Sequence, residues 1–230
     1  MTRVLDVARI QLVHWPTLLA YPFILLAAMP LLGWGIDISN GETGLSGHEI
    51  FLLPALWGLT APAHLQTMTQ VFPFTLGLGV TRRTFAAATA LVVLGQALLV
   101  GLGLLAFAAV ERLTGGWGRQ ARIFDLDAFG HGNPLTQWLV YSGPLLAVSA
   151  LSVLAGMVFQ RWRQTGIYLA VLGSAALLGG AAKLATARHW WPSIGKFLGG
   201  QPLTLFTAYP LVVALALGGA AWLVLRRATT

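Results

Sequence analysis

The sequence predicts an all-α membrane protein with six transmembrane helices. Of its 230 residues, 57% are hydrophobic and only 9% are charged, whereas about 25% of the residues in an average soluble domain are charged. Six apolar runs each approach the roughly 20 residues that a helix needs to cross a bilayer core. All 14 basic and 7 acidic residues lie outside these runs. We therefore expect one membrane domain over residues 1–230.

Residues 1–15 precede the first apolar run and predict a helix that lies in the membrane interface. In a helical conformation, the apolar and charged side chains of this segment fall on different sides, as in helices that bind a membrane surface. The apolar side carries Val4, Leu5, Ala8 and Leu12, and the charged side carries Arg3, Asp6 and Arg9. A charged lead-in that only orients the first span explains the same pattern and stays open as an alternative.

The six predicted spans follow one another along the whole chain. They cover residues 18–36, 50–71, 85–110, 138–159, 166–182 and 205–225. Lipid offers no hydrogen-bond partners, and a helix satisfies its backbone groups within one segment, so each run is expected to be helical. A charge at the centre of such a helix costs about 2.5 to 3.5 kcal/mol, which explains the absence of charged residues from these runs.

The distribution of charge between the spans predicts which ends face the cytoplasm. One set of connections carries eight basic residues and one acidic residue, and the other set carries six of each. The first set consists of Arg3, Arg9, Arg82, Arg83, Arg161, Arg163, Arg226 and Arg227 with Asp6. Cytoplasmic loops carry an excess of Lys and Arg, so both termini are expected in the cytoplasm. The net charge of +7 is interpreted as this topology signal together with lipid-headgroup contacts, and not as a surface for nucleic acid.

The connection between the second and third spans, residues 72–85, has the composition of a tight hairpin. Pro73 favours the start of a helical turn. Gly77 and Gly79 permit a sharp reversal of the chain. Thr81 or Thr84 can then cap the next helix. By composition alone, an ordinary hairpin anchored at the membrane edge explains this segment as well.

Polar residues inside the spans are candidates for a transport pathway or a dimer interface, because polar groups in lipid need a cavity or a helical partner. The candidates are Thr60, His64, Thr67 and Gln70 in the second span, Gln96 in the third and Tyr141 in the fourth. The first three share one helical face, whereas Gln70 lies on another. Hydrogen bonds between neighbouring helices explain the same residues without any transport role.

The string FPFTLGLGVTRRTF at residues 72–85 resembles the segment between the second and third spans of a group of bacterial, chiefly actinobacterial, ABC exporter permeases. These permeases belong to the type-2 ABC transporter permease family. The similarity extends over most of the chain, including residues 114–118, 161–166, 191–197 and 225–229. The sequence is thus similar to an exporter subunit of the bacterial plasma membrane.

This resemblance implies that two permeases, identical or paralogous, pair with two ATPase subunits. The hairpin would be the coupling helix that docks on an ATPase, residues 1–15 the connecting helix, and residues 190–198 a short outer helix that dips back toward the membrane. The coupling residues would be Phe72, Pro73, Phe74, Gly77, Gly79, Thr81, Arg82 and Arg83. The chain lacks the phosphate-binding motif GxxxxGK(S/T), so ATP and Mg are expected on the partner subunit and no cofactor on this chain.

Two other classes of function stay open from the sequence. A membrane-embedded enzyme needs catalytic groups, but no acidic residue lies in a span and neither an HExxH nor a GxSxG motif occurs. A Ser of the fourth span acting with His64 is the remaining enzymatic arrangement. Asp125, Asp127 and His131 form an incomplete ligand set, so no metal site is predicted. A membrane scaffold or immunity protein would need no polar pathway, whereas an exporter would expel an amphipathic substrate by alternating access.

Overall fold

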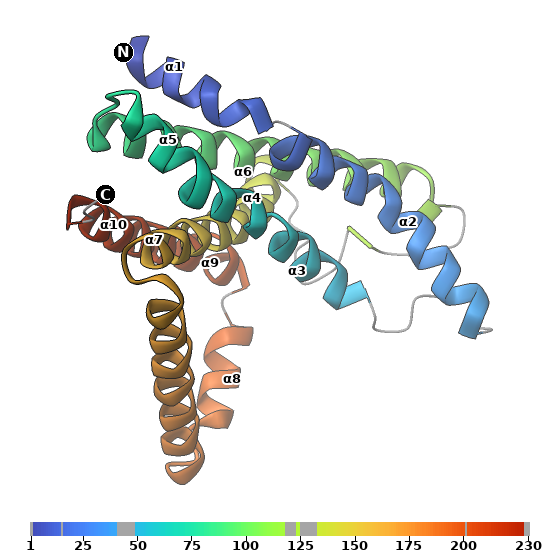
Figure 1. Ribbon diagram of the computed structural model, residues 1–230. Helices are drawn as coiled ribbons and strands as arrows, with labels where there is room; N and C mark the ends of the chain where they lie inside the picture. Colours follow the sequence, from blue (N-terminus) through green and yellow to red (C-terminus); the bar gives the residue numbers. More distant parts are fainter. Residues whose placement is uncertain are drawn as a thin grey trace.

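The computed structural model describes residues 2–14, 16–40, 49–117, 123–124, 133–200 and 202–227. Within these ranges the regular structure is helical and no strand occurs, which confirms the all-α expectation (Figure 1). The α-helices are α1 Thr2–Gln11, α2 Tyr21–Asn40, α3 Glu49–Leu59, α4 Ala61–Gln66, α5 Phe72–Gly77, α6 Arg82–Leu113, α7 Pro134–Ala187, α8 Trp191–Gly199, α9 Pro202–Phe206 and α10 Ala208–Arg227. A 3-10 segment, η1 Leu12–His14, and two π-helical segments, η2 Pro16–Ala20 and η3 Thr67–Val71, connect some of them.

The N-terminal helix α1 packs along α6. Val7, Ala8 and Gln11 are buried in this contact, whereas Leu5 and Leu12 are 50% and 38% exposed. Leu5 and Leu12, which the sequence pattern groups with Ala8 on the apolar side, thus stay outside the contact with α6, and the placement of this helix in the membrane interface stays a prediction. The contact with α6 includes a hydrogen bond from Gln11 Nε2 to the Thr89 hydroxyl at 2.9 Å.

The second predicted span, residues 50–71, is divided among α3, α4 and η3. The break falls at Thr60, whose hydroxyl donates a hydrogen bond to the Trp57 carbonyl at 2.7 Å. Pro62 lies in the first turn of α4, and proline has no N–H with which to continue the preceding helix. In the first predicted span, by contrast, α2 continues through Pro30.

The long helix α6 packs against α7 and α1 and contains the third predicted span. Its 32 residues correspond to about 48 Å of helix, more than a bilayer core of about 30 Å. A Cβ atom at Gly101 would overlap the Ser142 side chain of α7, and one at Gly103 would overlap Phe23 of α2. These two glycines therefore let the neighbouring helices approach α6 closely.

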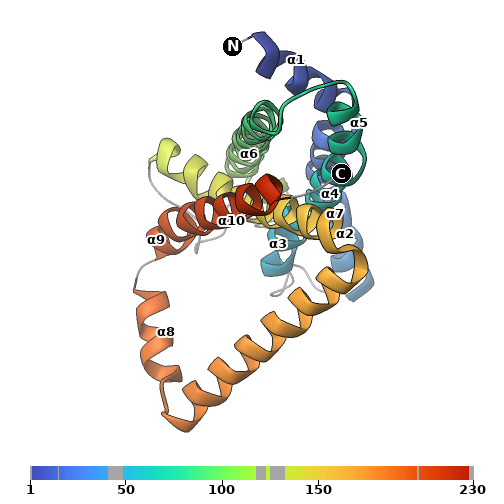
Figure 2. The same ribbon diagram turned by 60° about the vertical axis from the view of Figure 1, so that its left-hand side comes forward.

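The helix α7 bends sharply at Arg163 and consists of two halves. Arg163 has φ 55° and ψ −146°, outside the helical region. The predicted spans 138–159 and 166–182 lie on either side of this bend. The first half lies beside α10 in the bundle, whereas the second half leaves the bundle with α8 (Figure 2). Leu172 and Leu177 of this second half are 67% and 76% exposed.

Two clusters of buried apolar side chains hold the bundle together. One joins α2, α3, α6 and the first half of α7, and the other joins α1, η2, α4, η3, α5, α6, α7 and α10. The first includes Leu26, Val100, Leu104, Tyr141 and Leu145, and the second includes Val7, Met68, Phe72, Phe85 and Met157. Both α6 and the first half of α7 take part in both clusters.

Three helices in the described ranges are long and apolar enough to cross a membrane. They are Arg82–Leu113, Pro134–Ala187 and Leu203–Arg226. The 54 residues of α7 would measure about 80 Å if straight, so its two halves are each long enough for a crossing. These helices support a membrane protein, while the count of six spans and the side of the termini stay predictions.

Candidate functional site

The hairpin between α5 and α6 ends α5 with a Schellman motif. The Val80 N–H donates to the Thr75 carbonyl at 3.1 Å, and the Gly79 N–H donates to the Leu76 carbonyl at 2.9 Å. Gly79 has φ +78°, a left-handed conformation that favours glycine. Gly77 lies within the last turn of α5 and has no positive φ. Of the two glycines expected at the reversal, only Gly79 supplies the conformation that the turn requires.

The other side of the hairpin is fixed by a helix cap and an aromatic contact. Thr81 caps α6, because its Oγ1 accepts a hydrogen bond from the Thr84 N–H at 3.2 Å. The rings of Phe72 and Phe85 lie 5.0 Å apart between centroids, and both side chains are buried. Pro73 lies in the first turn of α5, as expected. The ends of α5 and α6 at the hairpin, and the turn between them, are therefore each held by specific contacts.

The tip of the hairpin exposes apolar side chains. Phe74 is 59% exposed and Leu78 is 61% exposed. Arg83, at the start of α6, is also exposed. Arg82, in contrast, donates a hydrogen bond from Nη1 to the Arg226 carbonyl at 3.1 Å. The two arginines are thus not equivalent, because Arg82 links α6 to the end of α10 and Arg83 faces outward.

The polar residues expected on one face of the second span are all buried. The hydroxyl of Thr67 donates to the Ala63 carbonyl at 3.0 Å, as Thr60 does to Trp57 within its own turn. His64 is 1% exposed and its side chain approaches the amide of Gln96 on α6. Neither His64 Nε2 nor Gln96 Oε1 has a hydrogen bond of good geometry.

Gln96 connects three parts of the bundle. Its Nε2 donates to the Leu18 carbonyl at 2.5 Å, so this side chain lies between η2 and α6 while it also meets His64 of α4. Gln70 is exposed and stands apart from these residues. The structure therefore brings His64 and Gln96 together and leaves Gln70 out.

A second polar cluster, centred on Glu111, was not recognised as a site from the sequence. Glu111 is 2% exposed and accepts a hydrogen bond from Trp117 Nε1 at 2.8 Å. It also accepts from the backbone N–H groups of Ile123 and Phe124 at 3.0 to 3.2 Å. The carboxylate thus fastens the chain that follows α6 to the end of that helix. Its only sequence signal is an acidic residue directly after a long apolar run.

Tyr141 belongs to this second cluster and not to the His64 and Gln96 pair. Its hydroxyl donates to the Phe124 carbonyl at 2.6 Å and accepts from Gln137 Nε2 at 2.8 Å. Arg112 Nη1 donates to Gln137 Oε1 at 3.3 Å. The predicted pathway candidate Tyr141 therefore holds the junction between the ends of α6 and α7.

In the described part of the chain, no group of three His, Cys, Asp or Glu side chains is arranged to hold a metal ion. The possible ligand set at Asp125, Asp127 and His131 lies outside the described residues. For this segment, the sequence-based interpretation as an incomplete set of metal ligands is therefore not tested.

Comparison with protein-family models, with curated proteins and with solved structures finds no match to this chain. The similarity to ABC exporter permeases therefore stays a prediction made from the sequence. What the hairpin and the buried polar residues can do must be inferred from their geometry.

Proposed function

We propose that this chain is the transmembrane subunit of an ABC exporter. In this proposal it pairs with a second copy or a paralogue and couples to ATP hydrolysis on two separate ATPase subunits. The observation that carries the proposal is the hairpin between α5 and α6, which is fixed in shape and exposes Phe74 and Leu78. A docking element needs both properties, because a rigid apolar tip can bury surface on a partner without a large ordering cost.

The position of the hairpin suits contact with a soluble subunit. The positive-inside rule places residues 72–85 on the cytoplasmic side, where an ATPase would meet them. Exposed apolar side chains on the polar side of a membrane protein are characteristic of interaction sites. Arg83 adds an exposed positive charge next to this tip, which suits an acidic rim on the partner.

Movement of the hairpin would reach the bundle through its neighbours. Gln160 of α7 donates from Nε2 to the carbonyls of Met68 and Thr69, at 3.0 and 2.8 Å. These carbonyls belong to the π-helical segment η3, which is followed directly by α5. Arg82 links the other arm of the hairpin to α10. In this proposal, a partner that displaces the hairpin would move α7 and α10 through these hydrogen bonds, as alternating access requires.

The proposal is tested by introducing a charge at the tip. Phe74→Asp and Leu78→Asp should each abolish copurification with the ATPase subunit that copurifies with the unmodified chain, because a carboxylate would be buried without a partner in the interface. The matched control is Leu113→Asp, since Leu113 is 87% exposed at the opposite end of α6. Normal copurification of both tip variants, in protein that inserts and folds correctly, would contradict the coupling role of the hairpin.

A further inference from the structure

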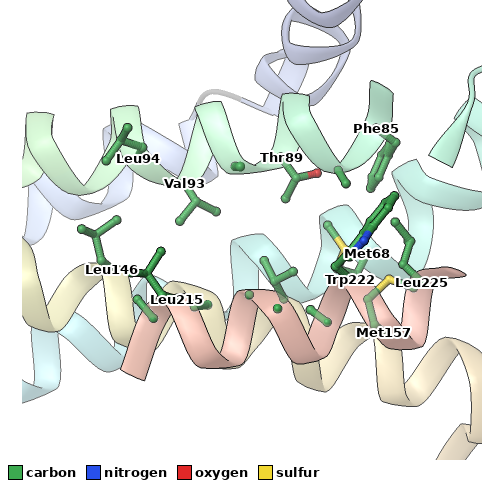
Figure 3. A pocket seen from close by; sticks show the side chains of 18 of the residues that line it. Met68, Phe85, Thr89, Val93, Leu94, Leu146, Met157, Leu215, Trp222 and Leu225 are labelled. Carbon is green, nitrogen blue, oxygen red and sulfur yellow. The ribbon is translucent and has the colours of Figure 1, made fainter. Parts of the chain in front are cut away.

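An apolar slot lies between α6 and α10, with the first half of α7 as its floor (Figure 3). The cavity measures about 350 Å³, within the size range of small-molecule sites. Thr89 and Val93 point into it from α6, and Met68, Phe85, Trp222 and Leu225 gather at one end (Figure 3). The Thr89 hydroxyl already accepts a hydrogen bond from Gln11 Nε2 at 2.9 Å. The lining therefore matches hydrocarbon.

The wall of the slot on α6 is about as long as one leaflet of a bilayer is thick. Its wall on α6 extends over ten residues, from Phe85 to Leu94, and the nine steps between them correspond to about 14 Å of helix. Half of a bilayer core is about 15 Å thick. A single acyl chain that enters from one leaflet could therefore lie along the whole α6 wall of the slot.

Basic residues mark the end of the slot at which the aromatic side chains gather. Arg82 lies one turn before Phe85 on α6, and Arg226 lies one turn after Trp222 on α10. The hydrogen bond from Arg82 Nη1 to the Arg226 carbonyl holds these two helix ends together. Guanidinium groups bind phosphate oxygens with strong, charge-assisted hydrogen bonds. By the charge distribution, this end faces the cytoplasm.

We propose that the slot binds an acyl chain of an anionic phospholipid from the cytoplasmic leaflet, with its phosphate held at the end marked by Arg82 and Arg226. Open space beside α10 accommodates the chain, because a Cβ atom placed on Gly218 or Gly219 would meet no other atom within 4 Å. An acyl chain in the slot would make dispersion contacts with its apolar lining. The site needs neither ATP nor a partner subunit, so its test is independent of the proposed export function.

Native mass spectrometry of the delipidated full chain in detergent tests this site with phosphatidylglycerol and phosphatidylcholine as probes. We expect one tightly retained phosphatidylglycerol. Arg226→Gln should lower the preference for phosphatidylglycerol over phosphatidylcholine by about fivefold, the effect of one basic residue near the headgroups. Arg161→Gln is the control, because Arg161 lies over the Trp162 ring on α7 and does not line the slot. Equal retention of the two lipids by the unmodified protein would overturn the assignment of an anionic ligand.

Gly218→Leu should remove the retained lipid by filling the slot. Gly173→Leu is its control, since Gly173 also has open space beside it but lies on the outlying half of α7. In unmodified protein, a phosphatidylglycerol with brominated chains should quench the fluorescence of Trp222, measured as the difference from Trp222→Phe. Lipid retention by Gly218→Leu equal to that of the control would overturn the proposal, as would the absence of Trp222 quenching. A loss of dimer in Gly218→Leu with lipid retained would instead assign the slot to a second copy of the chain.

Discussion

Glu111 ends the long apolar helix α6 with a carboxylate that is only 2% exposed. A charge buried to this extent is tolerated when hydrogen-bond donors surround it. Trp117 Nε1 and the N–H groups of Ile123 and Phe124 supply such donors, and the rings of Trp117 and Phe124 pack around Phe107. One side chain thereby fixes the path of the segment that leaves the helix.

Replacement of Glu111 should therefore destabilise the protein more than replacement of an exposed carboxylate. In Glu111→Gln, an NH₂ group that can only donate replaces one of the two oxygens that accept hydrogen bonds. We expect a loss of about 1 to 3 kcal/mol in the free energy of unfolding. The control is Asp6→Asn, because the Asp6 side chain is 63% exposed and its contact with Arg9 measures 3.9 Å. Thermal unfolding in detergent, followed by tryptophan fluorescence, measures both changes. Equal melting temperatures of the two variants would contradict the anchoring role of Glu111.

At the scale of elements, the hairpin between α5 and α6 is set by local sequence. The composition of residues 72–85 predicted its proline start, its reversal and its threonine cap, and all three occur at Pro73, Gly79 and Thr81. Such features depend on neighbouring residues only, so they can be inferred without knowledge of the rest of the fold. The exception is Gly77, which is helical because one left-handed residue is enough for the turn.

The two glycines of the hairpin should respond oppositely to alanine. Gly79→Ala forces a Cβ atom into φ +78° and should cost about 1 to 2 kcal/mol. Gly77→Ala should stabilise the protein by about 0.5 to 1 kcal/mol, because Gly77 is helical and a Cβ atom there meets no neighbour within 4 Å. Unfolding of the two variants by heat or denaturant measures the difference. A Gly79→Ala variant as stable as Gly77→Ala would show that the turn does not need its left-handed residue.

Contacts between distant elements could not be predicted in the same way. Gln96 meets the Leu18 carbonyl, and Gln11 meets Thr89, across 78 residues of sequence in each case. The sequence identified Gln96 and His64 as polar residues in apolar helices, which was enough to select them and not enough to pair them. The direction of the second half of α7 was equally unpredictable, because that segment is apolar on all sides and no pattern marks a face for packing.

At the scale of the whole molecule, the exposed surface of the long helices is apolar, as expected for a protein that lies in a bilayer. Leu172, Leu177 and Leu215 are each more than 65% exposed on long apolar helices, which is unfavourable in water and favourable in lipid. The basic residues Arg82 and Arg226 meet at one end of the bundle. This end is the cytoplasmic one under the six-span prediction.

Reporter fusions test the predicted topology. A reporter after the C-terminal residue should lie in the cytoplasm, and a reporter inserted at Gly116, beyond the other end of α6, should lie outside. An even number of crossings also requires a reporter at the N-terminus to agree with the one at the C-terminus. The same side reported at Gly116 and at the C-terminus would exclude the six-span arrangement.

Site-specific crosslinking tests the central proposal, that the hairpin docks on an ATPase, most directly. A photoreactive amino acid placed at Leu78 should form a crosslink to the ATPase subunit in intact membranes, because Leu78 is 61% exposed at the hairpin tip. The same amino acid at Leu113, which is 87% exposed at the opposite end of α6, should form none. A crosslink to the ATPase at Leu78 and not at Leu113 is the result that the exporter proposal predicts. Absence of that crosslink at Leu78, in membranes that contain both proteins, would contradict it.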